Sequence, residues 1–173
     1  MISSADLQRI TTLIFDIDGT LTDGKVAYGE SGDVIKFFDI ADLHWLKLAL
    51  RAGLKVGILS GRHDFANDRM IADVKLSFAL QGAKDKAAGF EQLLRENNLT
   101  AGECLCAGDD VVDMPMLRRA GIGVAVANAA PELDEVASFR TTAPGGGGAA
   151  AEIVRMVLKE KNLFDQIMER YRR

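Results

Sequence analysis

Cysteine, histidine and long apolar runs are scarce in this sequence, and each scarcity argues against a class of protein. The chain has two cysteines, two histidines and a formal net charge of −4, with both signs mixed along it. No apolar run approaches the length of a membrane span, and no basic surface of the nucleic-acid-binding kind is indicated. Residues 1–6 lack the basic and apolar regions of a signal peptide. We therefore expect a cytoplasmic protein that binds neither membranes nor nucleic acid.

The two cysteines, Cys104 and Cys106, are separated by a single residue. In a strand they would point to the same face, where they are poorly placed for a disulfide. We expect them to be buried free thiols. The histidines, His44 and His63, are isolated, so the sequence offers no zinc-type ligand set.

Short apolar runs alternate with amphipathic stretches along the 173 residues, a length typical of one domain. Predicted strands lie at 13–15, 55–59, 76–79, 104–107, 122–125 and 139–141. Predicted helices lie at 42–52, 65–71, 84–97, 113–119, 130–136 and 149–160. This alternation predicts a Rossmann-like, three-layer α/β/α fold with a central parallel sheet. Right-handed crossovers would bring the carboxyl ends of all strands to one edge.

Three further segments complete the expected single domain, 1–173. Residues 26–28 and 34–38 predict a β-hairpin, at about 25–38. The glycine-rich segment 144–151 is typical of a flexible linker, or of a mobile tail that approaches an active site. Residues 159–173 predict a terminal amphipathic helix.

Two carboxylates, Asp16 and Asp18, follow the strand 13–15 and precede Gly19. A helix cap and a turn would account for this pair. At the ligand-binding edge of a parallel sheet, however, two adjacent acids need a proton or a cation between them. Mg²⁺ would meet that need and support chemistry on a phosphoryl group.

Polar groups also follow three other predicted strands. Each set alone is typical of a turn, a solvated helix face or a helix cap. Together with Asp16 and Asp18 they would bring one hydroxyl, one cation and two acidic pairs to the same edge, which indicates one functional site. The sets are Ser60-Gly61-Arg62, Lys84-Asp85-Lys86 and Gly108-Asp109-Asp110 with Asp113.

These groups suit the hydrolysis of a phosphomonoester. Asp16 would attack phosphorus and form an aspartyl-phosphate. Asp18 would protonate the leaving oxygen and then activate water. Mg²⁺ and Lys86 would neutralise the phosphoryl oxygens.

The remaining groups would hold the phosphate and the metal. The Ser60 hydroxyl and the Gly61 amide would bind phosphoryl oxygens. Asp109 would complete the Mg²⁺ shell. Asp110 and Asp113 would order metal-bound water or nearby loops.

The same motifs resemble the haloacid dehalogenase superfamily of phosphatases. They are Asp16-x-Asp18-Gly19-Thr20, Ser60-Gly61-Arg62, Lys86 and Gly108-Asp109-Asp110-x-x-Asp113. The resemblance covers residues 10–160. It implies that Asp16 is the nucleophile and Asp18 the acid/base. It also implies that Mg²⁺ is held by the Asp16 side chain, the Asp18 backbone carbonyl and Asp109.

The spacing leaves no room for the cap domain that most members of that superfamily carry. Only 33 residues, 22–54, lie between the first motif and the strand 55–59, and 25 residues separate Ser60 from Lys86. An uncapped site has few walls with which to select a substrate. Such a site can gain selectivity in two ways: through a macromolecular substrate, or through an oligomer in which a neighbouring subunit supplies a wall of the active site.

Finer motifs resemble the 3-deoxy-D-manno-octulosonate 8-phosphate phosphatases, which are capless tetramers on the route to lipopolysaccharide. These motifs include Leu21-Thr22-Asp23-Gly24, Lys36-Phe37-Phe38, Arg69 and the segment Gly145-Gly146-Gly147-Gly148. The resemblance implies hairpins that meet at the tetramer centre and a glycine-rich segment that reaches a neighbour's active site. Its implied substrate is an acidic sugar phosphate.

Substrate contacts are also implied by the resemblance. Arg62 and Arg69 would face the anionic end of the substrate, within one subunit or across the interface, because the guanidinium fork suits a carboxylate. Thr22, Gly61 and Lys86 would complete the substrate-binding set. A surface arginine on a helix is the alternative for Arg69.

Two positions depart from that family's pattern. Asp42-Leu43-His44-Trp45 stands where the family usually shows Asp-Gly-x-Gly, and Ala151 stands where an arginine usually follows the glycines. Trp45 is either a buried core residue or part of a reshaped substrate site. A nonulosonate 9-phosphate, another sugar phosphate and a non-catalytic regulatory role are therefore the alternatives.

Overall fold

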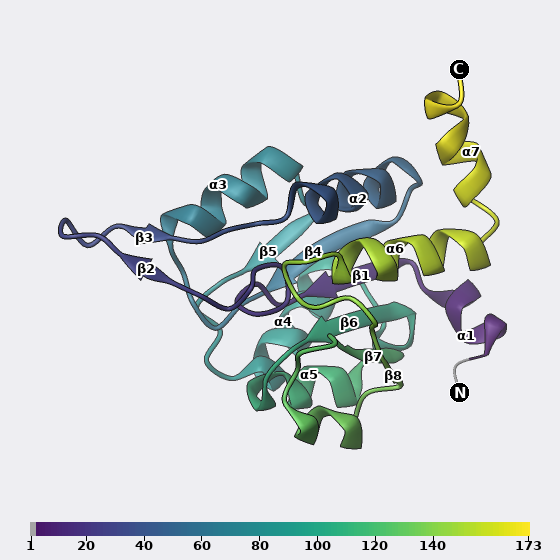
Figure 1. The fold of residues 1–173 in the computed structure, drawn as a ribbon. Coiled ribbons are helices and arrows are strands. Elements are labelled where there is room, and N and C mark those ends of the chain that lie inside the picture. Colours follow the sequence, from purple (N-terminus) through teal and green to yellow (C-terminus); the bar gives the residue numbers. More distant parts are fainter. Residues whose placement is uncertain (1–2) are drawn as a thin grey trace.

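A six-stranded parallel sheet forms the centre of the molecule (Figure 1), with the strand order β5-β4-β1-β6-β7-β8. The computed structural model describes residues 3–173. Residues 1 and 2, which belong to the segment 1–6 in which we expect no signal peptide, lie outside the described residues. The strands are β1 (Thr12–Phe15), β4 (Lys55–Leu59), β5 (Phe78–Leu80), β6 (Cys104–Gly108), β7 (Ile122–Ala125) and β8 (Phe139–Arg140). The predicted α/β architecture is confirmed.

Helices cover both faces of this sheet (Figure 1). One face packs against α1 (Ser4–Arg9), α2 (Ile40–Arg51), α3 (Phe65–Val74) and α6 (Ala149–Glu160). The other packs against α4 (Lys86–Asn97) and α5 (Met114–Arg119). The three predicted layers are therefore present, and the helices predicted at 42–52, 65–71, 84–97, 113–119 and 149–160 end within a few residues of those observed.

Strand β1 shows why both faces are covered. Leu13 and Phe15 belong to the first core and Ile14 to the second, and all three are fully buried. Side chains alternate across a strand, so a wholly apolar strand must be covered on both sides. Cys104 and Cys106 share the second core as buried free thiols, as predicted.

The predicted hairpin extends from the body as a separate two-stranded sheet (Figure 1). Its strands are β2 (Ala27–Tyr28) and β3 (Val34–Ile35), which pair antiparallel. Residues 16–86, which the structure describes throughout, contain no cap domain. Within residues 3–173, no helix combines the length and apolar character needed to cross a membrane.

Several short elements differ from the prediction. The segment 130–136 forms a 3₁₀ helix, η3 (Pro131–Glu135), in which Leu133 is the buried residue, so one apolar contact does not support a longer helix. The predicted terminal helix is broken at Asn162, whose φ of 57° is left-handed. Beyond the break lie α7 (Phe164–Met168) and the 3₁₀ helix η4 (Glu169–Tyr171). Two further 3₁₀ helices, η1 (Ala101–Glu103) and η2 (Val111–Asp113), flank β6. The short helix α1 was not predicted.

The glycine-rich segment is neither a flexible linker nor a mobile tail. The amide of Gly146 donates to the Thr20 carbonyl at 3.1 Å, and that of Gly145 donates to Asn128 Oδ1 at 2.8 Å. The buried Asp42 carboxylate accepts from the amides of Gly148 and Ala151, at 3.0 and 2.7 Å. It therefore caps α6, which begins inside the predicted tail. Hydrogen bonds between distant residues correct the compositional prediction.

Close packing between two glycines makes Gly145 a sharp test of this arrangement. A methyl group on Gly145 would overlap the Gly19 carbonyl oxygen, within the loop that follows β1. We expect Gly145→Ala to lower the free energy of unfolding by about 1–3 kcal/mol, the usual cost of overpacking. Urea unfolding measures this. Gly102→Ala is the matched control, because its methyl group would meet no atom within 4 Å. Equal stability of the two variants would contradict the packing.

Candidate active site

The carboxyl ends of β1, β4, β5 and β6 surround a cleft of about 330 Å³. Most of the predicted site residues line it, since parallel strands present these ends along one edge. Lys84, which the sequence places in one of the polar sets, also lines the cleft, and so do Ala83 and Val112, which were not predicted as site residues. The predicted residues in the lining are Asp16, Asp18, Ser60, Gly61, Arg62, Lys86, Asp109 and Asp110.

Asp16 lies at the base of the cleft, directly after β1, and is 6 % exposed. Its amide donates to the Ala107 carbonyl at 3.0 Å, which extends the pairing with β6. Lys86, the first residue of α4, places its Nζ 2.6 Å from Asp16 Oδ1. Both side chains are buried, so this ion pair is shielded from solvent and fixes the Asp16 carboxylate.

Asp113 supports this pair from behind. Its Oδ1 pairs with Lys86, and its Oδ2 accepts from the amides of Asp109 and Asp110, at 3.0 and 3.2 Å. Asp113 is fully buried and does not line the cleft. It therefore orders the loop after β6 and holds Lys86.

Three carboxylates of this group lie close enough to share a cation. Asp16, Asp109 and Asp113 each place an oxygen within 4.8 Å of the others. Burial raises the pKa of Asp109 to about 7, and the charges of Asp16 and Asp113 add to this shift. Burial likewise raises the pKa of Asp16 to about 6, against the opposing charge of Lys86. One ammonium does not neutralise three carboxylates, so this donor set fits a divalent cation.

The carboxylate cluster shares two members with the predicted ligand set. Asp16 and Asp109 are both in the cluster, but the third carboxylate is Asp113. Lys86 and two amides already occupy the oxygens of Asp113, which leaves Asp16 and Asp109 as the better side-chain donors. Ligation by the Asp18 carbonyl stays a prediction.

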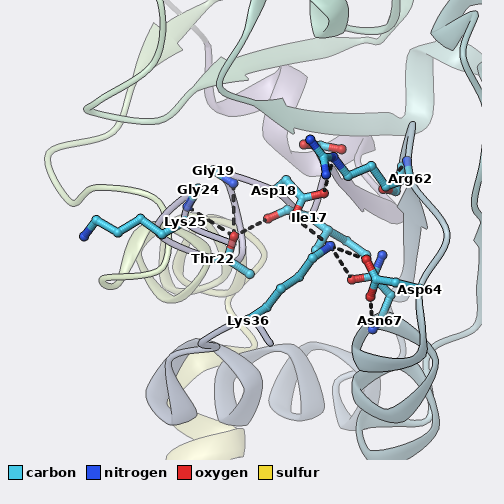
Figure 2. Close-up of polar contacts among 12 residues, drawn as sticks. Ile17, Asp18, Gly19, Thr22, Gly24, Lys25, Lys36, Arg62, Asp64 and Asn67 are labelled. Carbon is cyan, nitrogen blue, oxygen red and sulfur yellow. Dashed lines mark hydrogen bonds and ion pairs between the residues drawn. The ribbon is translucent and has the colours of Figure 1, made fainter. Parts of the chain in front are cut away.

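The Asp18 side chain, 20 % exposed, lines the cleft and lies between two cations, Lys36 and Arg62 (Figure 2). Lys36 Nζ is 2.7 Å from Oδ1, and Arg62 Nε is 3.8 Å from Oδ2. This contact of Lys36 was not predicted from the sequence, because Lys36 was considered only as part of a motif that resembles the phosphatase family. A lysine between the exposed Ile35 and Phe37 does carry a signal, since alternation turns it toward the body.

The end of β4 supplies the expected phosphate-binding groups. Ser60 is 1 % exposed, and its Oγ accepts from the Arg62 amide at 3.2 Å. Gly61 lies beside it in the lining of the cleft. Arg62 extends outward and donates to the Tyr28 hydroxyl at 3.3 Å, which joins the cleft to the hairpin.

Thr22 does not face the cleft, which corrects its predicted role as a substrate ligand. It is fully buried, and its hydroxyl accepts from the amides of Gly19 and Gly24, at 3.1 and 3.2 Å (Figure 2). The same hydroxyl donates to the Ile17 carbonyl at 3.3 Å. Thr22 therefore shapes the loop that carries Asp18.

Arg69 does not line the cleft of its own chain either. It is an exposed residue of α3. This position gives no support to a substrate contact within one subunit, and a contact across an interface stays a prediction.

Trp45 is a core residue, as one of its two interpretations required. Its ring stacks on Phe164, with centroids 6.0 Å apart, and Arg155 lies 4.3 Å above its centroid. Trp45 is 9 % exposed and does not line the cleft. Trp45 therefore packs α7 against α2 and does not reshape the substrate site.

Known proteins share both the sequence and this arrangement. A family model described as a haloacid dehalogenase-like hydrolase matches residues 80–153. The 3-deoxy-D-manno-octulosonate 8-phosphate phosphatase KdsC of Escherichia coli K12 is 31 % identical over 162 residues, which cover 94 % of this chain and 86 % of that protein. The chain belongs to the haloacid dehalogenase-like hydrolases. Like its KdsC relatives, this hydrolase is a phosphatase.

Two solved structures extend the likeness over nearly all of this phosphatase. The Moraxella catarrhalis 3-deoxy-D-manno-octulosonate 8-phosphate phosphatase, in complex with magnesium, phosphate and KDO, has a TM-score of 0.93 and 29 % identity, and the match covers 97 % of both chains. A probable YrbI family phosphatase from Pseudomonas syringae has a TM-score of 0.94 and 34 % identity, over 98 % of this chain and 97 % of that one. The fold of the phosphatase is therefore that of its relatives throughout.

The surplus of carboxylates in this phosphatase leads to a pH-dependent effect of Mg²⁺ on stability. The raised pKa values of Asp16 and Asp109 mean that the folded, metal-free protein binds more protons than the unfolded chain between about pH 4 and pH 7. Its free energy of unfolding should therefore fall as pH rises through this range. Bound Mg²⁺ would compensate the ionised carboxylates, so it should stabilise more at about pH 8 than at about pH 5.

Thermal unfolding with Mg²⁺ or with a chelator, at both pH values, measures this difference. Asp109→Asn should lose most of it, because the variant lacks one of the titrating ligands. A rise in Tm with Mg²⁺ that is the same at both pH values would contradict the assignment.

Proposed function

We propose that this phosphatase removes phosphate from 3-deoxy-D-manno-octulosonate 8-phosphate, with Mg²⁺ as its cofactor. The observation that carries the proposal is the convergence of Asp16, Lys86 and Asp109 at the base of the cleft, with Asp18 beside them. The names of the KdsC relatives and the magnesium, phosphate and KDO bound to the Moraxella catarrhalis enzyme support it.

The first step is attack by Asp16 on phosphorus. The Asp16 carboxylate, fixed by Lys86, forms a bond to phosphorus while the bond to the sugar oxygen breaks. Asp18 donates a proton to that oxygen, and an aspartyl-phosphate remains on Asp16. In the second step Asp18 takes a proton from water, whose oxygen attacks phosphorus while the bond from phosphorus to Asp16 breaks, which releases phosphate and restores the Asp16 carboxylate.

The charges around the cleft match a phosphoryl group. Lys86 at its base and the Ser60 and Gly61 end of β4 provide a cation, a hydroxyl and an amide for the phosphoryl oxygens. Mg²⁺, when bound through Asp16 and Asp109, supplies further positive charge against the negative charge of the phosphate.

The mouth of the cleft favours a second anionic group on the substrate. Arg62 and Lys84 line it, and the Arg62 side chain is 56 % exposed and free to reach outward. A guanidinium binds a carboxylate through two parallel hydrogen bonds, which suits a sugar acid better than a neutral sugar. We place the reaction in the cytoplasm, on the route to lipopolysaccharide, and the free thiols Cys104 and Cys106 suit a reducing compartment.

A substrate comparison tests the proposal. With Mg²⁺ present, kcat/KM for 3-deoxy-D-manno-octulosonate 8-phosphate should exceed that for glucose 6-phosphate and for a nonulosonate 9-phosphate at least tenfold, about 1.4 kcal/mol in the transition state. Phosphate release measures the rates. Asp16→Asn should keep the fold and abolish turnover. Equal rates for all three substrates would exclude the narrow assignment, and activity retained by Asp16→Asn would exclude the nucleophile.

We also propose that four copies assemble through the hairpin, so that a neighbour walls the uncapped cleft. Support comes from large apolar side chains exposed on and beside the hairpin, where solvent exposure is costly. Tyr28 also connects this surface to Arg62. The exposed residues are Tyr28, Ile35, Phe37, Ile40 and Phe65, which are 70, 51, 69, 83 and 77 % accessible.

Light scattering at micromolar concentration tests the assembly. We expect a tetramer for the native protein and smaller species for Phe37→Ser, since this change removes an apolar contact from the proposed interface. Tyr171→Ser is the control, because Tyr171 is an exposed aromatic residue of η4, next to the C-terminus. The C-terminus lies at the opposite end of the molecule from the hairpin (Figure 1). A monomeric native protein would overturn the proposal, as would equal dissociation of both variants.

A further inference from the structure

Lys36 is a buried cation in an otherwise exposed hairpin. Its side chain is 0 % exposed, although Ile35 and Phe37 on either side of it are open to solvent. A lysine is almost never fully buried unless its charge is paired, because removing an ammonium from water costs several kcal/mol. The partners of Lys36 therefore explain why it lies there.

The Lys36 amine lies among three oxygens from two parts of the chain (Figure 2). Nζ is 2.7 Å from Asp18 Oδ1 and 2.6 Å from Asp64 Oδ2, and it donates to Asn67 Oδ1 at 3.0 Å. Only Asp18 of these three lines the cleft, and Lys36 itself does not. Lys36 thus reaches the site through Asp18 alone.

The other two partners of Lys36 are fixed at the start of α3. Asp64 is the N-cap of this helix, and its Oδ1 accepts from the Asn67 amide at 3.0 Å while its Oδ2 pairs with Lys36. Asn67 is fully buried. The amine is therefore anchored to a helix end whose own hydrogen bonds hold it in place.

Asp18 faces a second and less constrained cation on its other side. Arg62 Nε lies 3.8 Å from Oδ2, and the Arg62 side chain is largely exposed. A carboxylate on two rotatable bonds would turn toward Arg62 or solvent without a fixed partner. Proton transfer in both steps requires one of its oxygens to stay within hydrogen-bond reach of the leaving oxygen and then of water.

We propose that Lys36 is a positioning residue for the reaction: it holds the Asp18 carboxylate in its working orientation, with Asp64 and Asn67 as the anchor. This inference rests on the proposed function, in which Asp18 is the acid/base. It also connects the hairpin to catalysis, because Lys36 directly follows β3.

Lys36→Met tests the proposal, since methionine keeps the length of the side chain and removes its charge. We expect kcat for the sugar phosphate to fall about 10- to 100-fold, the usual cost of a misplaced catalytic group, with KM nearly unchanged. Lys25→Met is the matched control. The Lys25 side chain is 85 % exposed and, within residues 3–173, pairs with Asp23 alone, so its loss should leave both constants unchanged.

A double-mutant comparison separates positioning from general support of the fold. If Lys36 acts through Asp18, adding Lys36→Met to Asp18→Asn should cost nothing further. First-turnover release from 4-nitrophenyl phosphate should also survive in Lys36→Met, because nitrophenolate leaves without a proton donor. A merely structural role would lower every one of these rates.

Three results would overturn the inference. They are a native kcat in Lys36→Met, a further loss in the Asp18→Asn background, and an equal loss of first-turnover release from the aryl phosphate. If Lys36→Met does not fold, Asp64→Asn replaces it, since this change weakens the anchor and should lower kcat with KM kept. An inactive native protein, or full activity in Asp18→Asn, would instead refute the proposed function.

Discussion

The concentration of negative charge at the carboxyl edge of β1 and β6 is the constraint on which the rest of this site depends. Buried carboxylates repel one another, and the fold sets Lys86 between Asp16 and Asp113 to limit the cost. Although burial opposes the charge of Lys86, the two carboxylates raise its pKa, so it stays an ammonium ion. The remaining charge is what makes the cleft receptive to a divalent cation and, through it, to a phosphate. Repulsion among these carboxylates lowers the stability of the metal-free fold, and the same carboxylates form a preorganised site.

The two acids of the first motif differ because their neighbours differ. Asp16 is buried against Lys86, which suits a nucleophile that must remain in one place. Asp18 is more exposed and meets Lys36, whose other contacts belong to α3. Two aspartates two residues apart thus have different surroundings, a division that suits the two roles proposed for them. The hairpin contributes to that division by burying a single lysine.

Much of the site could be predicted from sequence, because the topology of a parallel sheet determines where residues that follow its strands lie. Asp16, Ser60, Lys86 and Asp109 all follow strands, and the carboxyl ends of parallel strands meet at one edge. What could not be predicted depends on contacts between distant residues. The burial of Thr22 follows from a tight loop, and the ordering of the glycine-rich segment follows from Asp42, more than a hundred residues away in sequence. The composition of a segment indicates how flexible it would be in isolation. It gives no information on hydrogen bonds to residues far away in the sequence.

The stacking of Trp45 on Phe164 has a consequence for observing the molecule in solution. Trp45 is the only tryptophan of the chain, and it is almost wholly shielded by α7, Arg155 and the core. Departure of the C-terminal segment would hydrate the indole and shift its fluorescence to the red. The intrinsic emission therefore reports on one joint, between α2 and α7, without any added label. Trp45 does not line the cleft, so emission and catalysis can be followed as separate observables.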